Sequence, residues 1–258
     1  MHAEPQETPL TGGNMAELVV RAGDTVRKPG TKSSASVQAL LRHLAEAGFE
    51  GAPRGLGIDE QGRQVFEYVP GAMADKAGPM TEAELRRVGR MIRELHDLTA
   101  TFVPPADAAW DVVVPADVDE VICHHDLAPW NLVLGEDDRW VFIDWDGAGP
   151  GSRLWDLGWA AHGFVPLYPW GNPATTAEQA PRLRALVDGY GLDEAQRRAL
   201  PEMMVGPVRG MYELLVRGAA SGEQPWARLH EEGHADHWGP AADYIEEHAE
   251  VWRAALLR

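Results

Sequence analysis

The sequence predicts an α+β protein with a small strand-rich N-terminal lobe and a larger helical C-terminal lobe. Short extended runs separated by turn residues fill the first seventy residues, whereas apolar residues recur every three or four positions from Thr81 onward. We therefore expect a flexible arm over residues 1–11, a first lobe over residues 12–70 and a second lobe over residues 71–258. The 258 residues are enough for two lobes that share a cleft.

Four extended runs and one helix are expected in the first lobe. The runs pair as two hairpins, Glu17–Ala22 with Thr25–Pro29 and Gly55–Asp59 with Gln64–Val69. The helix spans about 34–47, because serines at its start can cap it and four apolar residues form one stripe along it. These four residues are Val37, Leu40, Leu41 and Leu44.

The second lobe begins with an amphipathic helix. Thr81 and Glu84 form a capping-box pattern at its start. Its apolar positions are Leu85, Val88, Ile92, Leu95 and Leu98. Three short apolar runs follow, Val121–Cys123, Leu132–Leu134 and Trp140–Ile143, and the last two are predicted to form a hairpin. The last hundred residues are predicted to be mostly helical, with breaks at clusters of proline and glycine.

Charge and composition exclude several classes of protein. The formal net charge is −17, which is opposite in sign to the basic surface that binds nucleic acid. No apolar run approaches the roughly 20 residues that cross a bilayer, and the N-terminus lacks the apolar core of a secretory signal. Cys123 is the single cysteine, so no disulfide can form within the chain. We expect a cytoplasmic protein that binds neither nucleic acid nor membrane.

The chemically informative segment runs from His124 to Asn131 and continues at Ile143-Asp144. Asp126 and Asn131 are five positions apart, and Asp144 follows Asn131 by thirteen. Because a hairpin lies between them, the loop before it and the loop after it must lie side by side. The oxygen atoms of three side chains therefore converge, and oxygen ligands of this kind suit Mg²⁺ held jointly with phosphate groups.

This arrangement resembles that of a known family. The pattern His-x-Asp-x-x-x-x-Asn, an apolar strand, Ile143-Asp144 and then Asp156-Leu157 is similar to the aminoglycoside phosphotransferase and choline kinase family, a branch of the protein-kinase-like superfamily. The resemblance extends over about 12–255 and is strongest in 121–158. It implies a two-lobed protein-kinase-like fold and transfer of the γ-phosphoryl group of ATP or GTP to a hydroxyl group.

The resemblance also implies roles for single residues. Asp126 would be the catalytic carboxylate that orients the acceptor hydroxyl and takes its proton. Asn131 and Asp144 would hold Mg²⁺ against the nucleotide phosphates. His124 and Asp156 would brace the catalytic loop through hydrogen bonds.

The nucleotide-binding residues are expected in the first lobe. Gly12 and Gly13 could form the glycine turn over the phosphates. A cation from the strand that contains Val26 should contact the α- and β-phosphates. If Val26 points into the core, alternation directs Arg27 to the cleft, with Lys28 as the alternative.

Two further features of the nucleotide site follow from the resemblance. The segment Phe66-Glu67-Tyr68-Val69 resembles the linker whose backbone binds the adenine edge; an ordinary strand end is the other interpretation. Family members pair the phosphate-binding cation with a glutamate of the following helix. No glutamate lies in the middle of the predicted helix, and Gln38 is the nearest polar residue.

A small acceptor molecule is expected rather than a protein. Only eleven residues separate Asp144 from Asp156, which leaves no room for a long activation segment. Aromatic residues and carboxylates of the C-terminal part could cradle an amine, so that an aminoglycoside or a similar aminated, sugar-like molecule is the expected acceptor. The aromatic candidates are Trp159, Trp170, Tyr190, Tyr212, Trp226 and Trp238, and the carboxylates are Asp188, Glu213 and Glu231.

Three alternatives remain open at this point. The first is a choline- or homoserine-type metabolic kinase. The second is a nucleotide-binding pseudoenzyme, which the missing helix glutamate favours and the intact set of Asp126, Asn131 and Asp144 disfavours. The third is a metal-dependent hydrolase, whose ligands would be His124 and His125 together with His96 and His162.

Overall fold

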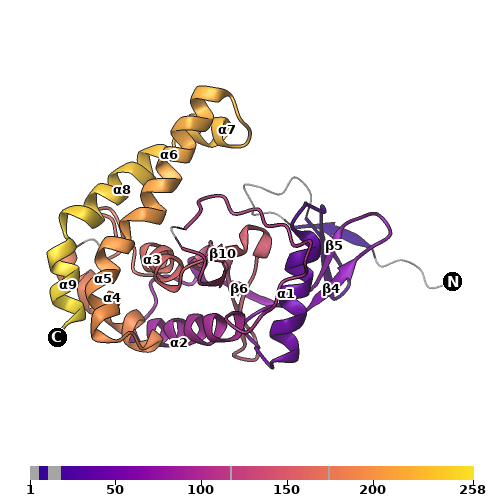
Figure 1. The fold of residues 1–258 in the computed structure, drawn as a ribbon, viewed down its shortest axis with the longest axis horizontal. Helices are drawn as coiled ribbons and strands as arrows, with labels where there is room; N and C mark the ends of the chain where they lie inside the picture. Colours follow the sequence, from indigo (N-terminus) through magenta and orange to yellow (C-terminus); the bar gives the residue numbers. More distant parts are fainter. Residues whose placement is uncertain (1–5, 11–18, 117, 174) are drawn as a thin grey trace.

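The computed structural model describes residues 6–10, 19–116, 118–173 and 175–258. A sheet with one covering helix lies at one end of the molecule, and a helical region lies at the other (Figure 1). The predicted α+β class is confirmed. No helix among the described residues is long and apolar enough to cross a membrane.

The N-terminal sheet is antiparallel and has the strand order β1-β2-β3-β5-β4. Its strands are β1 (Glu7–Pro9), β2 (Val20–Ala22), β3 (Thr25–Lys28), β4 (Gly55–Ile58) and β5 (Gln64–Glu67). The helix α1 (Ser34–Glu46) contacts this sheet and buries the predicted apolar stripe. The prediction of a flexible arm is wrong for Glu7–Pro9, because this segment pairs with β2 as an edge strand.

Two smaller sheets support the central loops. One has the order β6-β8-β9, and in the other β7 pairs with β10. Their bounds are β6 (Gly71–Met73), β7 (Val121–Cys123), β8 (Leu132–Gly135), β9 (Trp140–Phe142) and β10 (Gly149–Gly151). Short 3₁₀ turns η1 (Ala74–Lys76), η2 (Pro129–Asn131) and η3 (Trp145–Gly147) lie between these strands. The predicted hairpin is therefore confirmed as β8 and β9.

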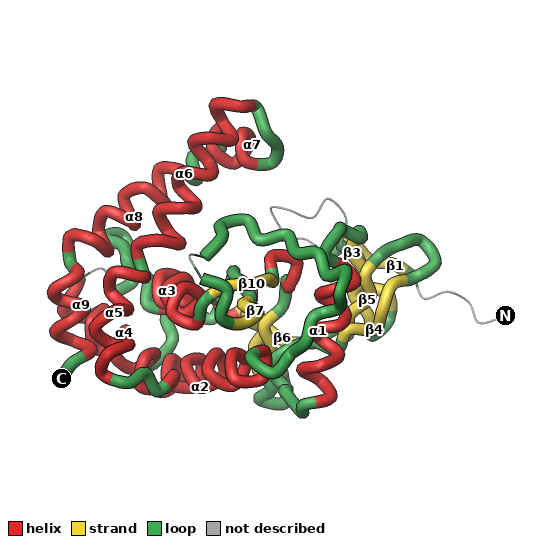
Figure 2. The backbone as a smooth tube through the Cα atoms, viewed as in Figure 1, coloured by secondary structure: helices red, strands yellow, loops and turns green. Residues whose placement is uncertain are grey.

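The C-terminal region is mainly helical, and its first two helices, α2 (Glu82–Thr99) and α3 (Arg153–Phe164), contact each other. The predicted capping box of Thr81 and Glu84 starts α2. The remaining helices are α4 (Thr176–Tyr190), α5 (Glu194–Met203), α6 (Val205–Ser221), α7 (Trp226–Glu231), α8 (Ala235–Glu247) and α9 (Ala249–Leu256). Helices α6 and α8 form an arm that carries α7 at its tip (Figure 2).

Residues 109–114 form a strap that crosses the middle of the molecule. The backbone nitrogen of Ala109 donates to Ser36 Oγ of α1 at 3.0 Å. Farther along, Val112 packs against Gly149 of β10 and Val114 packs against Gly210 of α6. A Cβ atom at either glycine would meet a valine side chain at 2.4 Å, so only glycine allows this close approach.

Candidate active site

The β8–β9 hairpin brings the two halves of the sequence motif together. Leu132 pairs with Phe142, and the backbone nitrogen of Ile143 donates to the carbonyl oxygen of Asn131 at 2.8 Å. The residue that precedes β8 and the residues that follow β9 are thus adjacent. Asp144 adopts a left-handed backbone conformation, with φ of 63°, which turns the chain sharply after the hairpin.

Asp126 is fixed by hydrogen bonds to both of its carboxylate oxygens. Asn131 Nδ2 donates to Oδ2 at 2.7 Å, and Trp159 Nε1 of α3 donates to Oδ1 at 3.0 Å. Burial and the nearby charge of Asp144 raise the pKa of Asp126 to about 7, although hydrogen bonds from Asn131, Trp159 and Trp130 act in the opposite direction. A carboxylate with such a pKa is suited to accept a proton at neutral pH.

A buried cation, Lys28, contacts two carboxylates that follow β9. Lys28 Nζ is 2.7 Å from Asp144 Oδ1 and 2.7 Å from Asp146 Oδ2. Burial alone would lower the pKa of Lys28, but the two carboxylates outweigh it and raise that pKa, so the amine is an ammonium. Burial likewise opposes ionisation of Asp144, and Lys28 outweighs it and lowers the pKa of Asp144. Gln64 Nε2 donates to Asp146 Oδ1 at 3.0 Å.

The expectation that Arg27 faces the cleft is wrong. Arg27 Nη1 lies 3.7 Å from Asp59 and 3.8 Å from Glu7, on the opposite face of β3 from Lys28. Val26 and Lys28 are two positions apart and therefore share a face. Val26 is half-buried rather than part of the core, and the face that it shares with Lys28 is the one directed to Asp144 and Asp146.

Gln38 does not take the place of the missing helix glutamate. Its Oε1 accepts from the backbone nitrogen of Gly57 at 2.8 Å, and its Nε2 donates to the carbonyl oxygen of Val65 at 3.4 Å. Gln38 therefore ties α1 to β4 and β5. The carboxylates that pair with Lys28 are those of Asp144 and Asp146. Asp144 is a predicted site residue, whereas Asp146 is not.

The segment from the end of β5 to Val69 makes contacts of its own. Glu67 pairs with Arg139 Nη1 at 2.8 Å, and the guanidinium of Arg21 lies 3.8 Å from the ring centroid of Tyr68. Val69 is half-buried. Binding of adenine by the backbone of residues 67–69 stays a prediction. Gly12 and Gly13 lie outside the described residues.

Asp156 holds the start of the loop at residues 124–131 through hydrogen bonds. It is fully buried and accepts hydrogen bonds from the backbone nitrogens of His124 and His125, each at 3.0 Å, and from His96 Nε2 at 3.1 Å. Burial opposes its ionisation, but the hydrogen bond and charge of His96 lead the contributions that lower the pKa of Asp156 to about 2. Asp156 therefore makes hydrogen bonds of the kind expected from the sequence, to the backbone of His124 and His125.

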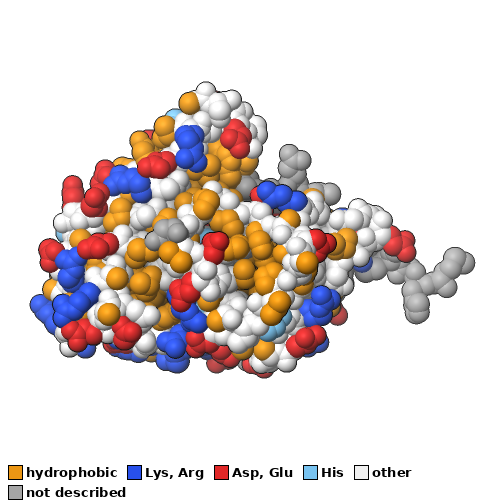
Figure 3. All heavy atoms as spheres, viewed as in Figure 1, with side chains coloured by type: hydrophobic (Ala, Val, Ile, Leu, Met, Phe, Trp, Pro, Cys, Tyr) orange, Lys and Arg blue, Asp and Glu red, His pale blue; other side chains and the backbone are white. Residues whose placement is uncertain are grey.

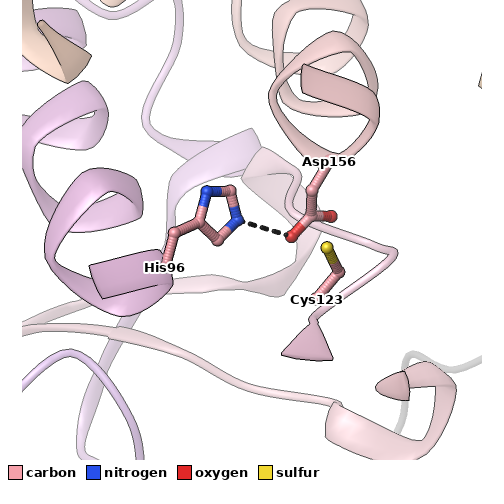
Figure 4. Close-up of side chains that lie close together, drawn as sticks. All are labelled: His96, Cys123 and Asp156. Carbon is pink, nitrogen blue, oxygen red and sulfur yellow. Dashed lines mark hydrogen bonds and ion pairs between the residues drawn. The ribbon is translucent and has the colours of Figure 1, made fainter. Parts of the chain in front are cut away.

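Cys123 joins His96 and Asp156 in one buried cluster (Figure 4). Each group has a partner inside the protein. Burial raises the pKa of the Cys123 thiol, which stays protonated and donates to the carbonyl oxygen of Ser152 at 3.4 Å. His96 Nδ1 bonds to the hydroxyl of Tyr190 at 2.9 Å. The cluster is thus a satisfied hydrogen-bond network. The only sequence signal for His96 is its place on the buried face of α2.

His124 links the two motif loops. It is buried, its Nε2 donates to the carbonyl oxygen of Ile143 at 3.0 Å, and its Nδ1 accepts from the backbone nitrogen of Asp126 at 3.2 Å. His125 Nε2 donates to the carbonyl oxygen of Pro150 at 3.0 Å. Because both imidazoles are engaged with the backbone, the set of histidine ligands imagined for a hydrolase is not assembled.

Helix α3 places Trp159 next to Asp126, and α8 and the segment after α3 add aromatic rings that connect to Trp159. Trp159 and Trp238 are stacked, with ring centroids 5.2 Å apart and an interplanar angle of 24°. A second stacked pair, Tyr168 and Trp170, has a centroid distance of 5.3 Å. We call the connected group the aromatic wall. It consists of Trp159, His162, Tyr168, Trp170, His237 and Trp238.

Other aromatic candidates from the sequence lie elsewhere. Tyr190 is buried and bonds to His96, and Trp226 packs against Gly218 near the tip of the arm. Tyr212 packs against Gly239 of α8. The expected association of these rings with nearby carboxylates in one cradle is therefore wrong for this set.

The carboxylates expected in that cradle are also dispersed. Asp188 pairs with Arg197 at 2.8 Å. Glu213 lines a separate cavity of about 630 Å³ between the strap and α6, and Glu231 ends α7. On the face shown in Figure 3, apolar side chains gather over the centre, and most charged side chains lie around the edges.

Comparison with known proteins identifies relatives of the chain. Residues 106–200 match the model of the phosphotransferase enzyme family, APH. A trifolitoxin immunity protein from Rhizobium leguminosarum bv. trifolii is 34% identical over 206 residues, which cover 76% of this chain and 78% of that protein.

Solved structures share the fold at low sequence identity. A choline/ethanolamine kinase family protein from Mesorhizobium loti has a TM-score of 0.65 at 20% identity, with 98% of this chain and 92% of that chain covered. The amicoumacin kinase hAmiN, in complex with AMP-PNP, Ca²⁺ and Ami, has a TM-score of 0.69 at 13% identity, with 94% and 88% covered. The chain therefore belongs to the phosphotransferase enzyme family and has the protein-kinase-like fold of choline kinases and aminoglycoside phosphotransferases.

Proposed function

We propose that this protein is a small-molecule kinase that transfers the γ-phosphoryl group of ATP or GTP to a hydroxyl group. One observation carries the proposal. The carboxylate of Asp126 is held by Asn131 and Trp159, the ammonium of Lys28 is held by Asp144, and Asp144 is close enough for its charge to raise the pKa of Asp126. A pseudoenzyme that only bound nucleotide would have no use for a proton acceptor fixed in this way.

Asp126 and Lys28 have separate tasks in the proposed reaction. Asp126 orients the acceptor hydroxyl and takes its proton as the new oxygen–phosphorus bond forms. The bond between the γ-phosphorus and the bridging oxygen breaks, and the nucleoside diphosphate leaves. Lys28 supplies positive charge to the phosphates, and its burial beside two carboxylates fixes the position of its ammonium group.

Asn131 and Asp144 would hold the magnesium ion. The Asp144 side chain is 46% exposed although it pairs with Lys28, so its carboxylate can reach a ligand in the cleft. Asn131 turns its amide nitrogen to Asp126, which leaves its amide oxygen as a ligand atom. These oxygen ligands fit Mg²⁺, which when bound neutralises charge on the phosphates. The residues therefore fit the group that the family implies.

The acceptor is a small hydroxylated molecule, and the proposed role is the inactivation of a toxic compound in the cytoplasm. The relative described as a trifolitoxin immunity protein and the fold shared with an amicoumacin kinase support this role. An aminated, sugar-like acceptor is favoured by the net charge of −17. A choline- or homoserine-type kinase is the metabolic alternative, which the fold shared with a choline/ethanolamine kinase family protein supports.

A coupled assay for nucleoside diphosphate release tests the proposal. ATP and GTP are supplied in parallel, with Mg²⁺, against aminoglycosides, other hydroxylated antibiotics, choline and sugars. We expect acceptor-dependent release that is lost in the Asp126→Ala variant. Nucleotide binding without release for every acceptor in this panel would contradict the proposal and favour a pseudoenzyme.

A further inference from the structure

The aromatic wall is attached directly to the proposed catalytic carboxylate. Trp159 is 4% exposed, and its indole nitrogen donates to Asp126 Oδ1 at 3.0 Å while its ring stacks on Trp238 of α8. An acceptor whose hydroxyl reaches Asp126 must therefore place the rest of its structure within a few ångströms of these rings. Trp159 is therefore a neighbour of the acceptor in the proposed reaction, and the rest of the wall extends from it.

The rings are arranged as parallel pairs rather than as a box. Trp159 stacks on Trp238, and Tyr168 stacks on Trp170 with an interplanar angle of 30°. His237 stands between the pairs, with its ring at 87° to Trp238 and 71° to Tyr168. The inner face of each stacked ring is already covered by its partner. Trp159 is buried, so the ring that a ligand can contact most freely is that of Trp170, and Tyr168 and Trp238 are half-buried. A flat ring extends such a stack better than a compact ammonium group.

Charge on the wall also disfavours recognition of an amine. Within the described residues, the hydrogen bonds and ion pairs of the wall include one carboxylate, that of Asp126. The two imidazoles are neutral, because burial lowers the pKa of His162 to about 3 and also lowers the pKa of His237. A polyamine would therefore find few carboxylates here to pair with its ammonium groups. A neutral ring needs no such partner, because the free-energy cost of removing it from water is small.

Part of this surface is open to solvent. Trp170 is 49% exposed, and Trp130, next to Asp126 in the catalytic loop, is 41% exposed. They are the most exposed tryptophans in the chain. Trp130 is a hydrogen-bond partner of Asp126, and Trp170 is connected to Trp159 through His237 and Trp238, so exposed indoles are available near the carboxylate and along the wall to hold a ligand ring.

We infer that the acceptor presents a planar unsaturated ring to the aromatic wall, beside the hydroxyl that Asp126 deprotonates. This inference rests on the proposed kinase function and narrows the class of its acceptor. It departs from the aminoglycoside expected from composition, because the ring and not the ammonium group is the feature that is recognised.

A matched pair of diols tests the inference through binding, without requiring turnover. The probes are 3-phenylpropane-1,2-diol and 3-aminopropane-1,2-diol, which share the diol and differ in the ring or amine. A second pair of larger probes makes the same comparison, with chloramphenicol as the ring-bearing member and kanamycin as the amine-bearing member. Dissociation constants come from quenching of tryptophan fluorescence and from calorimetry. We expect the ring-bearing member of each pair to bind about tenfold more tightly, the scale of one stacked ring.

Variants connect this binding to the wall. Trp170→Leu and Trp238→Leu should each weaken binding of the ring-bearing probes about tenfold. Trp170 is half-exposed, so its replacement should leave the protein folded. Trp226→Phe is the matched control, because Trp226 lies near the tip of the arm and outside the wall. For any ring-bearing probe that is phosphorylated, Trp170→Leu should raise KM far more than it lowers kcat.

The outcomes separate this inference from the proposed function. Tighter or equal binding of the amine-bearing probes overturns the inference, and so does ring binding that both wall variants leave unchanged. Failure of both ring-bearing probes to bind at their solubility limits also overturns it. If the ring-bearing probes bind through Trp170 but neither they nor any acceptor of the wider panel is phosphorylated, the inference stands and the kinase proposal fails.

Discussion

The ammonium nitrogen of Lys28 and the carboxylate oxygen Oδ1 of Asp144 lie 2.7 Å apart, although the two residues are separated by 116 positions in the sequence. Asp146 contacts the same nitrogen at 2.7 Å. One ammonium between two carboxylates leaves a net negative charge at this point of the cleft. Such a charge favours the approach of a divalent cation and, through it, of nucleotide phosphates.

Replacing Lys28 with Met should weaken nucleotide binding about tenfold to a hundredfold, the scale of one hydrogen bond to a charged group. Arg27→Met should have little effect, because Arg27 faces Asp59 on the other side of β3. Calorimetric titration with ATP and Mg²⁺ measures both. Circular dichroism must show that the Lys28 variant is folded, because it leaves two carboxylates without their cation. Equal losses in the two variants would contradict this ranking.

Asp126→Ala should lower turnover by about 10²–10⁴, the usual scale for the loss of a positioned proton acceptor. Nucleotide affinity should stay near that of the wild type, because the proposed role of Asp126 is to contact the acceptor rather than the phosphates. Steady-state kinetics with a confirmed acceptor and a parallel nucleotide titration test both statements. Normal turnover in this variant would show that another group takes the proton.

Asp144→Ala should abolish the part of nucleotide binding that depends on Mg²⁺. The physical reason is that Asp144 offers the one carboxylate of the proposed metal site that is nearly half exposed. Thermal unfolding with ATP should then show little difference between Mg²⁺ and EDTA. The wild type, measured side by side, should show a clear difference. If the variant showed a Mg²⁺-dependent shift as large as that of the wild type, Asp144 would not be a ligand of the metal ion.

Asp156→Ala should destabilise the protein by about 3 kcal/mol, because three buried N–H donors lose their acceptor. Chemical denaturation with urea measures the change. Glu202→Ala is a suitable control, since its ion pair with Arg253 is exposed and should contribute little. Activity should fall together with stability, because the backbone of His124 and His125 positions the catalytic loop. A stability equal to that of the wild type would rule out the brace.

Stability should fall as the pH is lowered from about 6.5 towards 3. Burial holds the pKa of His162 near 3, whereas an exposed histidine titrates near 6.5, so the unfolded chain binds the proton first. One such group gives a slope of up to about 1.4 kcal/mol per pH unit in this window. The facing groups are His237, at 3.3 Å, and His234 beyond it. Urea unfolding at pH 7 and pH 5 measures the slope.

His162→Leu should flatten this pH dependence, because a leucine has no proton to gain. His230→Gln, in α7 and outside the aromatic wall, is the control and should keep the slope of the wild type. If the slope of the His162 variant equalled that of the wild type, another group would be responsible.

The features predicted correctly depend on contacts that are close in sequence. The β8–β9 hairpin brings Asn131 and Asp144 together whatever the rest of the chain does, because its own ladder of hydrogen bonds enforces that proximity. The start of α2 was predictable for the same reason, since the capping box of Thr81 and Glu84 closes over three residues.

The features predicted wrongly depend on how distant elements pack. The choice between Arg27 and Lys28 requires knowledge of which face of the sheet α1 covers, and strand alternation alone does not provide it. The pairing of Asp146 with Lys28 joins segments more than a hundred residues apart. The aromatic wall includes residues of both α3 and α8. The stacking of Trp159 on Trp238 could not be predicted from local sequence patterns, because the two residues belong to helices that are distant in the sequence.

The pairing of β10 with β7 has a consequence for control of the protein. Between Asp144 and Asp156, the chain forms a 3₁₀ turn, then β10, and then the start of α3, where Ser152 caps the helix by accepting from the backbone nitrogen of Trp155. In signalling kinases this region is a loop that phosphorylation moves into place. Here it is already built into a sheet. The segment is therefore held in place without a covalent modification, and the proposed kinase should not need phosphorylation of residues 145–155 for its activity.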